Sequence, residues 1–415
     1  MSSIQKENLV KKFVDRKITQ LQHILHGFFL AIATTIAEPA TILPIIISFF
    51  TTNPFVVGLF SSLIKGGAIL VQIFAAFGAQ SYPRMMPYLY FVFAARFLSW
   101  FGIGLVLVFL GPSHPLLTLW LMGLGFFIFS VAAGFGTVYF NEIIAKVFSH
   151  KVRGQTTAIR QFFASIGAIS SGAAAGYILS HYEAPMSFGY LFMVSALIML
   201  LGIISFATIK EPVKKVVSQK ESHFKHYLAN TARLLKASKP LQYQIASYLL
   251  SYSYLFALPF VILDAKDQIG LDGKTIGLFV SLQMSGAMLS NLLWGFLASK
   301  HLNRAIVLIA FIAASLSMFL ALIGSSIWVY GLLFFLIGAA MDGFKLAFGN
   351  LIIIIAPEDK RPIYLALQSN LTSIGLFFAL PGSLILTLFN YQLLYLCTLA
   401  LLIYGFIFSL KRLHQ

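Results

Sequence analysis

Five ionisable residues lie inside long apolar stretches of the sequence, where lipid would be expected around them. Glu38, Lys65, Arg96 and Asp342 each lie near the middle of such a stretch, and Lys345 follows Asp342 by one helical turn. A charge at the centre of a bilayer costs roughly 2.5–3.5 kcal/mol on insertion scales, so such residues face protein or water and mark ion or solute paths. These residues therefore indicate binding of protons or charged solutes.

Glu38 has the sequence surroundings of a proton-coupling residue. Thr34, Glu38 and Thr41 recur at i, i+4 and i+7, which is one polar face of a helix. Pro39 and Pro44 predict a kink or local unwinding beside the carboxylate. Removal from water favours the protonated form of a carboxylate, so a proton could bind and leave here. A static hydrogen-bonding role is the alternative.

Lys65 lies on a helical stripe with Ser61, Ala68 and Gln72. Its ammonium group could neutralise Glu38 or bind an anionic solute. Both roles would place Lys65 in a cavity rather than against lipid.

Asp342 is the second candidate for carrying a proton. Its spacing from Lys345 allows joint action on a solute, or a purely structural pair within one helix. For Arg96 we expect snorkelling or a structural hydrogen bond, with solute contact as the alternative.

Several further polar residues lie on faces that could reach a cavity. Arg160 could instead snorkel to lipid phosphates, and tyrosines at a membrane interface need no special role. The candidate proton-coupling residues are Glu38 and Asp342, and the candidate solute-binding residues are Thr34, Thr41, Lys65, Gln72, Thr137, Asn141, Arg160, Tyr248, Tyr252, Asn291, Lys345, Asn350 and Gln368.

The sequence lacks the common signatures of ATP-driven pumps and of metal sites. The sequence has no P-loop, no HExxH and no CxxC motif. His23 and His26 are three residues apart, but no second pair completes a metal site, so a structural role is favoured. We expect no enzymatic activity, no cofactor and no bound metal.

The composition is that of an integral membrane protein. Of the 415 residues, 59% are hydrophobic and 10% are charged, with a mean hydropathy of +0.87. Soluble domains carry roughly 25% charged residues. The single cysteine, Cys397, excludes an intramolecular disulfide.

The chain contains twelve apolar runs of the length that a bilayer-spanning helix needs. The first follows a polar N-terminus and is too long for a secretory signal, so we expect it to be uncleaved. The predicted spans are 22–50, 55–79, 88–110, 116–146, 154–180, 186–209, 241–263, 274–298, 304–323, 327–356, 362–388 and 391–410.

Basic residues are distributed very unequally between the two sets of connections. One set holds only Lys266 and Lys274, whereas the other set, with both termini, holds 23 Lys and Arg residues. This is the positive-inside pattern, and it predicts both termini in the cytoplasm. It also locates the net charge of +16 at the inner leaflet, so nucleic-acid binding need not be invoked.

The longest connection, 210–240, divides the spans six and six. We predict an N-terminal tail (1–20), a first bundle (21–209), a cytoplasmic linker (210–240), a second bundle (241–410) and a C-terminal tail (411–415). In the linker, Phe224, Tyr227 and Leu228 interleave with basic residues, so part of it could be a helix on the membrane surface or a solvated loop.

The two bundles repeat one another in sequence. GLFSSLIKGGAIL begins at Gly58, and GLFVSLQMSGAML begins at Gly277. The match aligns Lys65 with Met284, so the repeat itself does not require a charge there. Repeated halves with a solute site between them are typical of secondary transporters.

The chain resembles the major facilitator superfamily. Gly295, Leu297, Ala298 and Arg304 match that family's loop signature G-x-L-A-D-R-x-G-R-R, with Ser299 in place of its Asp. The first copy keeps Gly78, Ala79 and Arg84, and the family's antiporter signature is reduced to Gly167, Gly172 and Gly176 without its Pro. The resemblance implies an all-α membrane fold of two pseudo-symmetric six-helix bundles, which rock about a central site.

The sequence therefore predicts a proton-coupled secondary active transporter of a small organic solute, with an anion or zwitterion favoured by the interior lysines. One alternative is a proton-antiporting exporter of drugs or amphipathic cations. Another is a non-transporting receptor or scaffold. We expect a monomer in a bacterial cytoplasmic membrane, whose partners are the solute, a proton or other coupling ion, and lipid.

Overall fold

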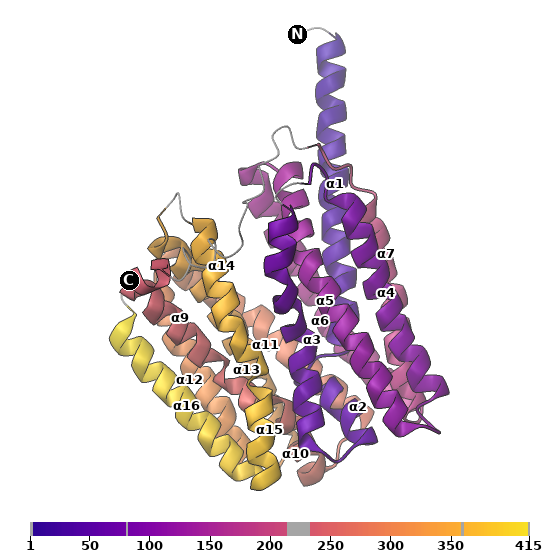
Figure 1. The fold of residues 1–415 in the computed structure, drawn as a ribbon, viewed down its shortest axis with the longest axis vertical. Coiled ribbons are helices and arrows are strands. Elements are labelled where there is room, and N and C mark those ends of the chain that lie inside the picture. The colour runs from indigo at the N-terminus through magenta and orange to yellow at the C-terminus, as the bar shows by residue number, and fades with distance from the viewer. Residues whose placement is uncertain (1–2, 80–81, 214–232, 358–360, 414–415) are drawn as a thin grey trace.

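The computed structural model describes residues 3–79, 82–213, 233–357 and 361–413 as an all-helical protein (Figure 1). The first half contains α1 (Ser3–Thr35), α2 (Ile42–Phe50), α3 (Pro54–Ala79), α4 (Met86–Phe109), α5 (Pro115–Val147), α6 (His150–His181) and α7 (Met186–Ala207). The second half contains α9 (Lys239–Ser251), η1 (Tyr252–Phe256), α10 (Leu258–Ile269), α11 (Gly273–Ser299), α12 (Asn303–Leu322), α13 (Ile327–Ile355), α14 (Arg361–Thr372), η3 (Ser373–Phe377), α15 (Ala379–Leu388) and α16 (Tyr391–Arg412).

The described helices are long and apolar enough for a multi-pass membrane protein. Ten helical segments among the described residues meet that standard, and Pro54–Ile69 of α3 is a shorter apolar segment. Helix α1 begins at Ser3, so the stretch predicted as a polar tail is largely helical. The greater part of the predicted linker, 214–232, lies outside the described residues. The total of twelve spans and the cytoplasmic position of the termini stay predictions.

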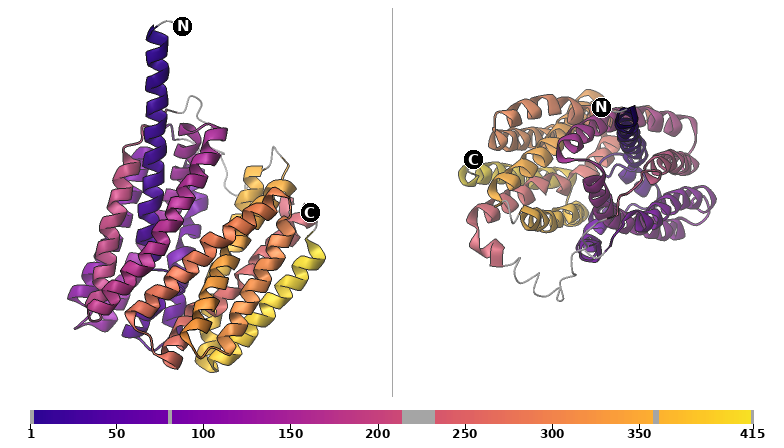
Figure 2. Two further views of the ribbon diagram at one scale, coloured as in Figure 1. Left: turned by 180° about the vertical axis from the view of Figure 1, so that it is seen from behind. Right: turned by 90° about the horizontal axis from the view of Figure 1, so that it is seen from above.

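The two halves lie side by side and converge at the end away from the chain termini (Figures 1 and 2). Contacts between them join α6 to α11, α3 to α15 and η3, and α10 to both α2 and α3. Helices α2 and α10 belong to this converging end. The molecule is therefore in a state that is closed at the end opposite the termini.

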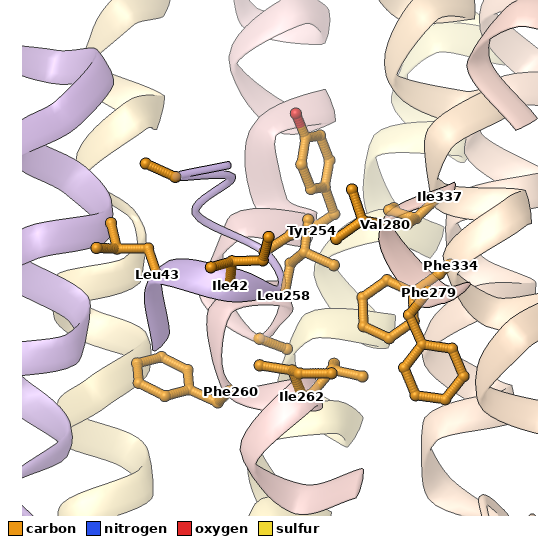
Figure 3. Close-up of a cluster of buried hydrophobic side chains, with 14 of the residues drawn as sticks. Ile42, Leu43, Tyr254, Leu258, Phe260, Ile262, Phe279, Val280, Phe334 and Ile337 are labelled. Carbon is orange, nitrogen blue, oxygen red and sulfur yellow. The ribbon is translucent and has the colours of Figure 1, made fainter. Parts of the chain in front are cut away.

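Apolar side chains close this end. Figure 3 shows Ile42 and Leu43 of α2 beside Leu258 and Phe260 of α10, all essentially inaccessible to solvent. Tyr254 of η1 lies at the same junction and is 6% exposed. The contact carries no ion pair among the described residues. Such a contact can separate without leaving an unpaired charge behind.

Three predicted spans are interrupted rather than continuous. The first breaks between α1 and α2, as Pro39 and Pro44 predict. The seventh is divided by η1 and the eleventh by η3, and neither break was predicted. Pro259, in the first turn of α10, and Pro381, in the first turn of α15, are the signals that could have revealed them.

Glycines set the distance between α6 and α11. A Cβ atom built on Gly277 would lie 2.3 Å from the carbonyl oxygen of Gly172, and one built on Gly172 would lie 2.7 Å from the carbonyl oxygen of Gly277. No side chain fits at that separation. The two backbones touch because neither residue carries a side chain.

Candidate functional site

Glu38 lies at the break in the first span. The peptide turns there, with the Glu38 amide donating to Thr35 O and the Glu38 carbonyl accepting from the Thr41 and Leu43 amides. The Lys65 ammonium of α3 lies 3.3 Å from Glu38 Oε1. The Glu38 side chain is 12% exposed, and that of Lys65 is 42% exposed. The ion pair is thus half sheltered, with its cation on the more open side.

The ion pair lines a narrow cavity that both halves share. Glu38 and Lys65 form its wall in the first half, together with Ser61. Its opposite wall comes from η1, α10, α13, η3 and α15, and includes Met341, the neighbour of Asp342. A charge at Glu38 is therefore at the junction of the halves, where a change in charge can act on both.

A second cavity of about 200 Å³ extends from the same ion pair into the first half. Thr34, Trp100 and Phe129 line it with Glu38 and Lys65. The Trp100 indole donates to Ser195 Oγ at 2.7 Å, and Ser195 in turn donates to a carbonyl of α1. The indole is therefore fixed as one rigid aromatic wall. Sequence reasoning did not select Trp100, and its helical stripe with Arg96 was the available signal.

Asp342 is held by an amide and not by Lys345. Asn291 Nδ2 of α11 donates to Asp342 Oδ2 of α13 at 2.7 Å. No ion pair joins Asp342 to Lys345 within 4.0 Å, and the Lys345 side chain is exposed. The alternative of a purely structural Asp342–Lys345 pair is therefore wrong for this state.

The two candidate tyrosines of the seventh span stack in the second half. Tyr248 stacks on Tyr252, with ring centroids 5.3 Å apart, and on Phe348 at 4.5 Å. Tyr252 packs against Gly375 of η3, where an added Cβ would lie 2.6 Å from Tyr252 Cβ. Neither ring lines the cavities that contain Glu38.

Two predicted solute-binding residues of the first half lie elsewhere than expected. Thr41 is 0% exposed, and its hydroxyl has no hydrogen-bond partner among the described residues. Because α1 ends at Thr35, the helical stripe linking Thr34 to Thr41 does not exist. Gln72 is half-buried and lines neither cavity beside Glu38.

The predicted residues nearer the termini fall into two groups. In α5, Thr137 and Asn141 are exposed, and the Thr137 hydroxyl donates to Ala133 O. In the second half, Asn350 donates to Asn303 Oδ1 at 2.9 Å, and buried Gln368 accepts from Gln244 at 2.7 Å. Asn350 and Gln368 are therefore occupied by partners within their own half.

The arginines lie inside the first half rather than snorkelling to its surface. The Arg96 guanidinium lies over the Phe129 ring at 4.6 Å, which is a cation–π contact. Arg160 passes across Gly27 of α1 and lies over Phe140 at 5.5 Å. The Nε atoms of both are buried without a hydrogen-bond partner among the described residues. The expected structural hydrogen bond of Arg96 is absent there.

His23 and His26 take the structural role that their spacing favoured. Both rings are almost fully buried. They stack on Phe140 at centroid distances of 5.5 and 5.3 Å. They belong to an aromatic layer of the first half and do not reach the cavity of Glu38.

Comparison with known structures shows the same fold along nearly the whole chain. The nucleoside transporter NupG matches with a TM-score of 0.73 at 13% identity, over 95% of this chain and 100% of that one. A D-xylose–proton symporter matches with a TM-score of 0.70 at 14% identity, over 97% and 98%. A bacterial homologue of the lysosomal transporter Spinster, in an inward-facing and unoccupied conformation, matches at 0.65 and 15%, over 96% and 98%.

The sequence comparisons give one match. No curated protein matches the chain significantly. The model of the Major Facilitator Superfamily matches residues 244–414, which is the second half. The second half is therefore similar to the major facilitator superfamily, and the whole chain shares the fold of the transporters above.

Proposed function

We propose that the chain is a proton-coupled secondary active transporter for a small anionic or zwitterionic organic solute. The observation that carries this proposal is the ion pair between Glu38 and Lys65, placed at a break in the first span and in a cavity that both halves line. Buried charges in a membrane protein mark ion or solute paths. No other described ion pair lies at the junction of the halves.

The pair couples a proton to an anion by competition. While Glu38 is ionised, it holds the Lys65 ammonium at 3.3 Å. A proton on Glu38 removes that attraction and leaves Lys65 available to an anionic group of the solute. Each ligand thus favours the binding of the other, as thermodynamic linkage requires. This logic predicts that a proton and an anion bind together.

Asp342 extends the site to zwitterions. Its carboxylate lies in the opposite half, next to Met341, which lines the cavity of the ion pair. A solute with an ammonium group could place that group at Asp342 and its carboxylate at Lys65. The solute would then bridge the halves and bias their arrangement.

The closed end supports alternating access. The halves meet through apolar side chains and glycine backbones at the end away from the termini. We propose that this contact opens as the opposite end closes, with the ion pair at the pivot. We further propose twelve spans, cytoplasmic termini, a bacterial cytoplasmic membrane and a monomeric unit.

A thermal-shift screen of the purified protein tests the solute class. Carboxylates, amino acids and amphipathic cations are compared at pH 5.5 and pH 7.5, because a ligand of the folded state raises the melting temperature. We expect an anion or zwitterion to raise it, and to do so more strongly at the lower pH.

Two variants control this screen. Lys65→Met, which installs the residue found at the repeat position Met284, should abolish the shift. Lys266→Met, at an exposed lysine that does not line the cavities beside Glu38, should retain it. A shift that occurs only with cations, or that survives in Lys65→Met, would contradict the proposal.

A further inference from the structure

A third cavity lies on the seam between α6 and α11, away from the ion pair. Its volume is about 340 Å³. Its floor is formed by Gly172, Gly176 and Gly277, where the two backbones touch. Tyr177 and Leu278 flank it and are 61% and 42% exposed. It is therefore an open trough on the outside of the helix pair and contacts both halves at once.

The trough changes from polar to apolar along its length. Helix α6 ends at His181 and α11 begins at Gly273, so Ser180, His181 and Lys274 lie at its outer end. Gly172 lies nine residues before His181, or roughly 13 Å along the helix. That is nearly half of a hydrocarbon core of about 30 Å. The trough thus follows the profile of one leaflet, from headgroup level to acyl chains.

The outer end carries a cation, Lys274, with the Asp272 carboxylate two residues before it. Lys274 is exposed and has no ion pair among the described residues. His181 Nδ1 lies 2.8 Å from Tyr177 O and donates to it, which orients the ring; Nε2 of the neutral ring is then an acceptor, so Lys274 is the donor available to an anionic ligand. A lysine of this kind is a natural partner for a phosphate.

We propose that this trough binds a phospholipid of the leaflet opposite the chain termini. The phosphate would lie at Lys274, and one acyl chain would lie along the glycine floor. The charge complements that of Lys274, and the apolar part of the trough has the depth of a leaflet. This inference concerns a second site and does not depend on proton coupling at Glu38.

A lipid bound in this trough would affect the conformational equilibrium of the protein. A ligand shifts an equilibrium only by its difference in affinity for the two states. The trough exists while α6 and α11 touch, so the lipid binds the closed end and is released when the halves part there. Bound lipid would therefore stabilise the state described here.

Native mass spectrometry of the detergent-purified protein with phosphatidylglycerol tests the site. We expect Lys274→Gln to weaken lipid binding about five-fold, the factor for one lysine near anionic headgroups. Lys266→Gln removes the other basic residue of the same side, outside the trough, and should leave binding unchanged. Diacylglycerol with the same acyl chains but no phosphate should bind more weakly than phosphatidylglycerol.

A steric variant provides independent evidence. Ala173 lines the trough and is exposed, so Ala173→Phe should fill the trough and displace the lipid. In the absence of lipid, this variant should melt at the same temperature as the wild type. Equal phosphatidylglycerol binding by wild type, Lys274→Gln and Ala173→Phe would overturn the proposal. Equal binding of diacylglycerol, or a second copy of the chain as the only species bound there, would overturn it too.

Discussion

Glu38 and Asp342 have partners of different charge, and this difference supports different proposed roles for the two carboxylates. Among the described residues, Glu38 has a charged partner in Lys65, whereas Asp342 has a neutral one in Asn291. A proton on Glu38 would release a cation, but a proton on Asp342 would release only an amide. Glu38 therefore suits proton coupling, and Asp342 suits a positively charged part of the solute.

Glu211 is the most heavily engaged carboxylate away from the cavity, and we predict that it stabilises the first half. Its oxygens accept from the Met85 and Met86 amides at 2.7–2.9 Å and from Lys146 Nζ at 2.7 Å. The carboxylate side chain is only 2% exposed. Removing one partner of a buried ion pair costs about 3–5 kcal/mol. Glu211→Gln should lower the melting temperature markedly, as measured by thermal unfolding in detergent.

The matched control for this prediction is Glu183→Gln, at an exposed glutamate. It should leave the melting temperature within experimental error of the wild type. If Glu211→Gln melts like Glu183→Gln, the Glu211–Lys146 pair contributes nothing to stability.

The types of the site residues could be predicted, and so could the pairing of Lys65 with Glu38, which was one of the roles expected for Lys65; the other pairings could not. Charge in an apolar run is visible in the sequence, so Glu38, Lys65 and Asp342 stood out. The pairing of Asp342 with Asn291 depends on how α11 and α13 rotate against each other, which spacing along one helix does not fix. The hydrogen bond from Gln244 to Gln368 could not be predicted for the same reason.

Two kinds of element control the junction of the halves: interrupted spans and close-packed glycine helices. The break after α1 places Glu38 in the cavity, and η1 contributes Leu255 to its opposite wall. The α6–α11 contact has no room for a side chain at Gly277. Conformational change at this seam therefore requires the two backbones to part and one hydrogen bond, from Ser281 Oγ of α11 to Ile169 O of α6 at 3.0 Å, to break.

Gly277→Leu should favour opening at this end. Its Cβ would lie 2.3 Å from Gly172 O, so the helices must separate by at least about 1 Å before ordinary contact is restored. Only the closed state bears this cost. Spin labels at positions 183 and 266, both exposed, in a Cys397→Ser background should show a longer mean distance.

Gly295→Leu on the same helix is the comparison, because a Cβ at Gly295 meets nothing within 4 Å. It should keep the wild-type distance. The same distance in wild type, Gly277→Leu and Gly295→Leu would show that the α6–α11 contact does not hold the closed state.

Except for α1, which begins at Ser3 rather than near residue 22, most element boundaries were predictable to within a few residues, since long apolar runs have one stable form in lipid. The run 116–146 became α5, Pro115–Val147. The breaks at η1 and η3 were not predicted. From sequence alone, a proline that begins a new helix after a break cannot be distinguished from a proline tolerated within a continuous span. The one break predicted, beside Glu38, had two prolines to mark it.

The whole molecule is two helical bundles in contact at one end, with the ion pair close to that contact (Figures 1 and 2). Such an arrangement can rock about the pair, because away from that contact the helices of each bundle pack against helices of the same bundle. The seam lipid and the transported solute would then bias the same motion from different places. The sequence repeat indicated this architecture, but it could not indicate which end is closed.

Transport by wild-type and Glu38→Gln protein in proteoliposomes tests the central claim most directly. Once the thermal-shift screen has supplied a solute, uptake is measured under an imposed pH gradient and, separately, as exchange of labelled for unlabelled solute without a gradient. We predict that Glu38→Gln loses accumulation driven by the gradient but keeps exchange, because Lys65 stays free to bind the solute. Gradient-driven accumulation by Glu38→Gln equal to that of the wild type would contradict the assignment of Glu38 as the proton-coupling residue.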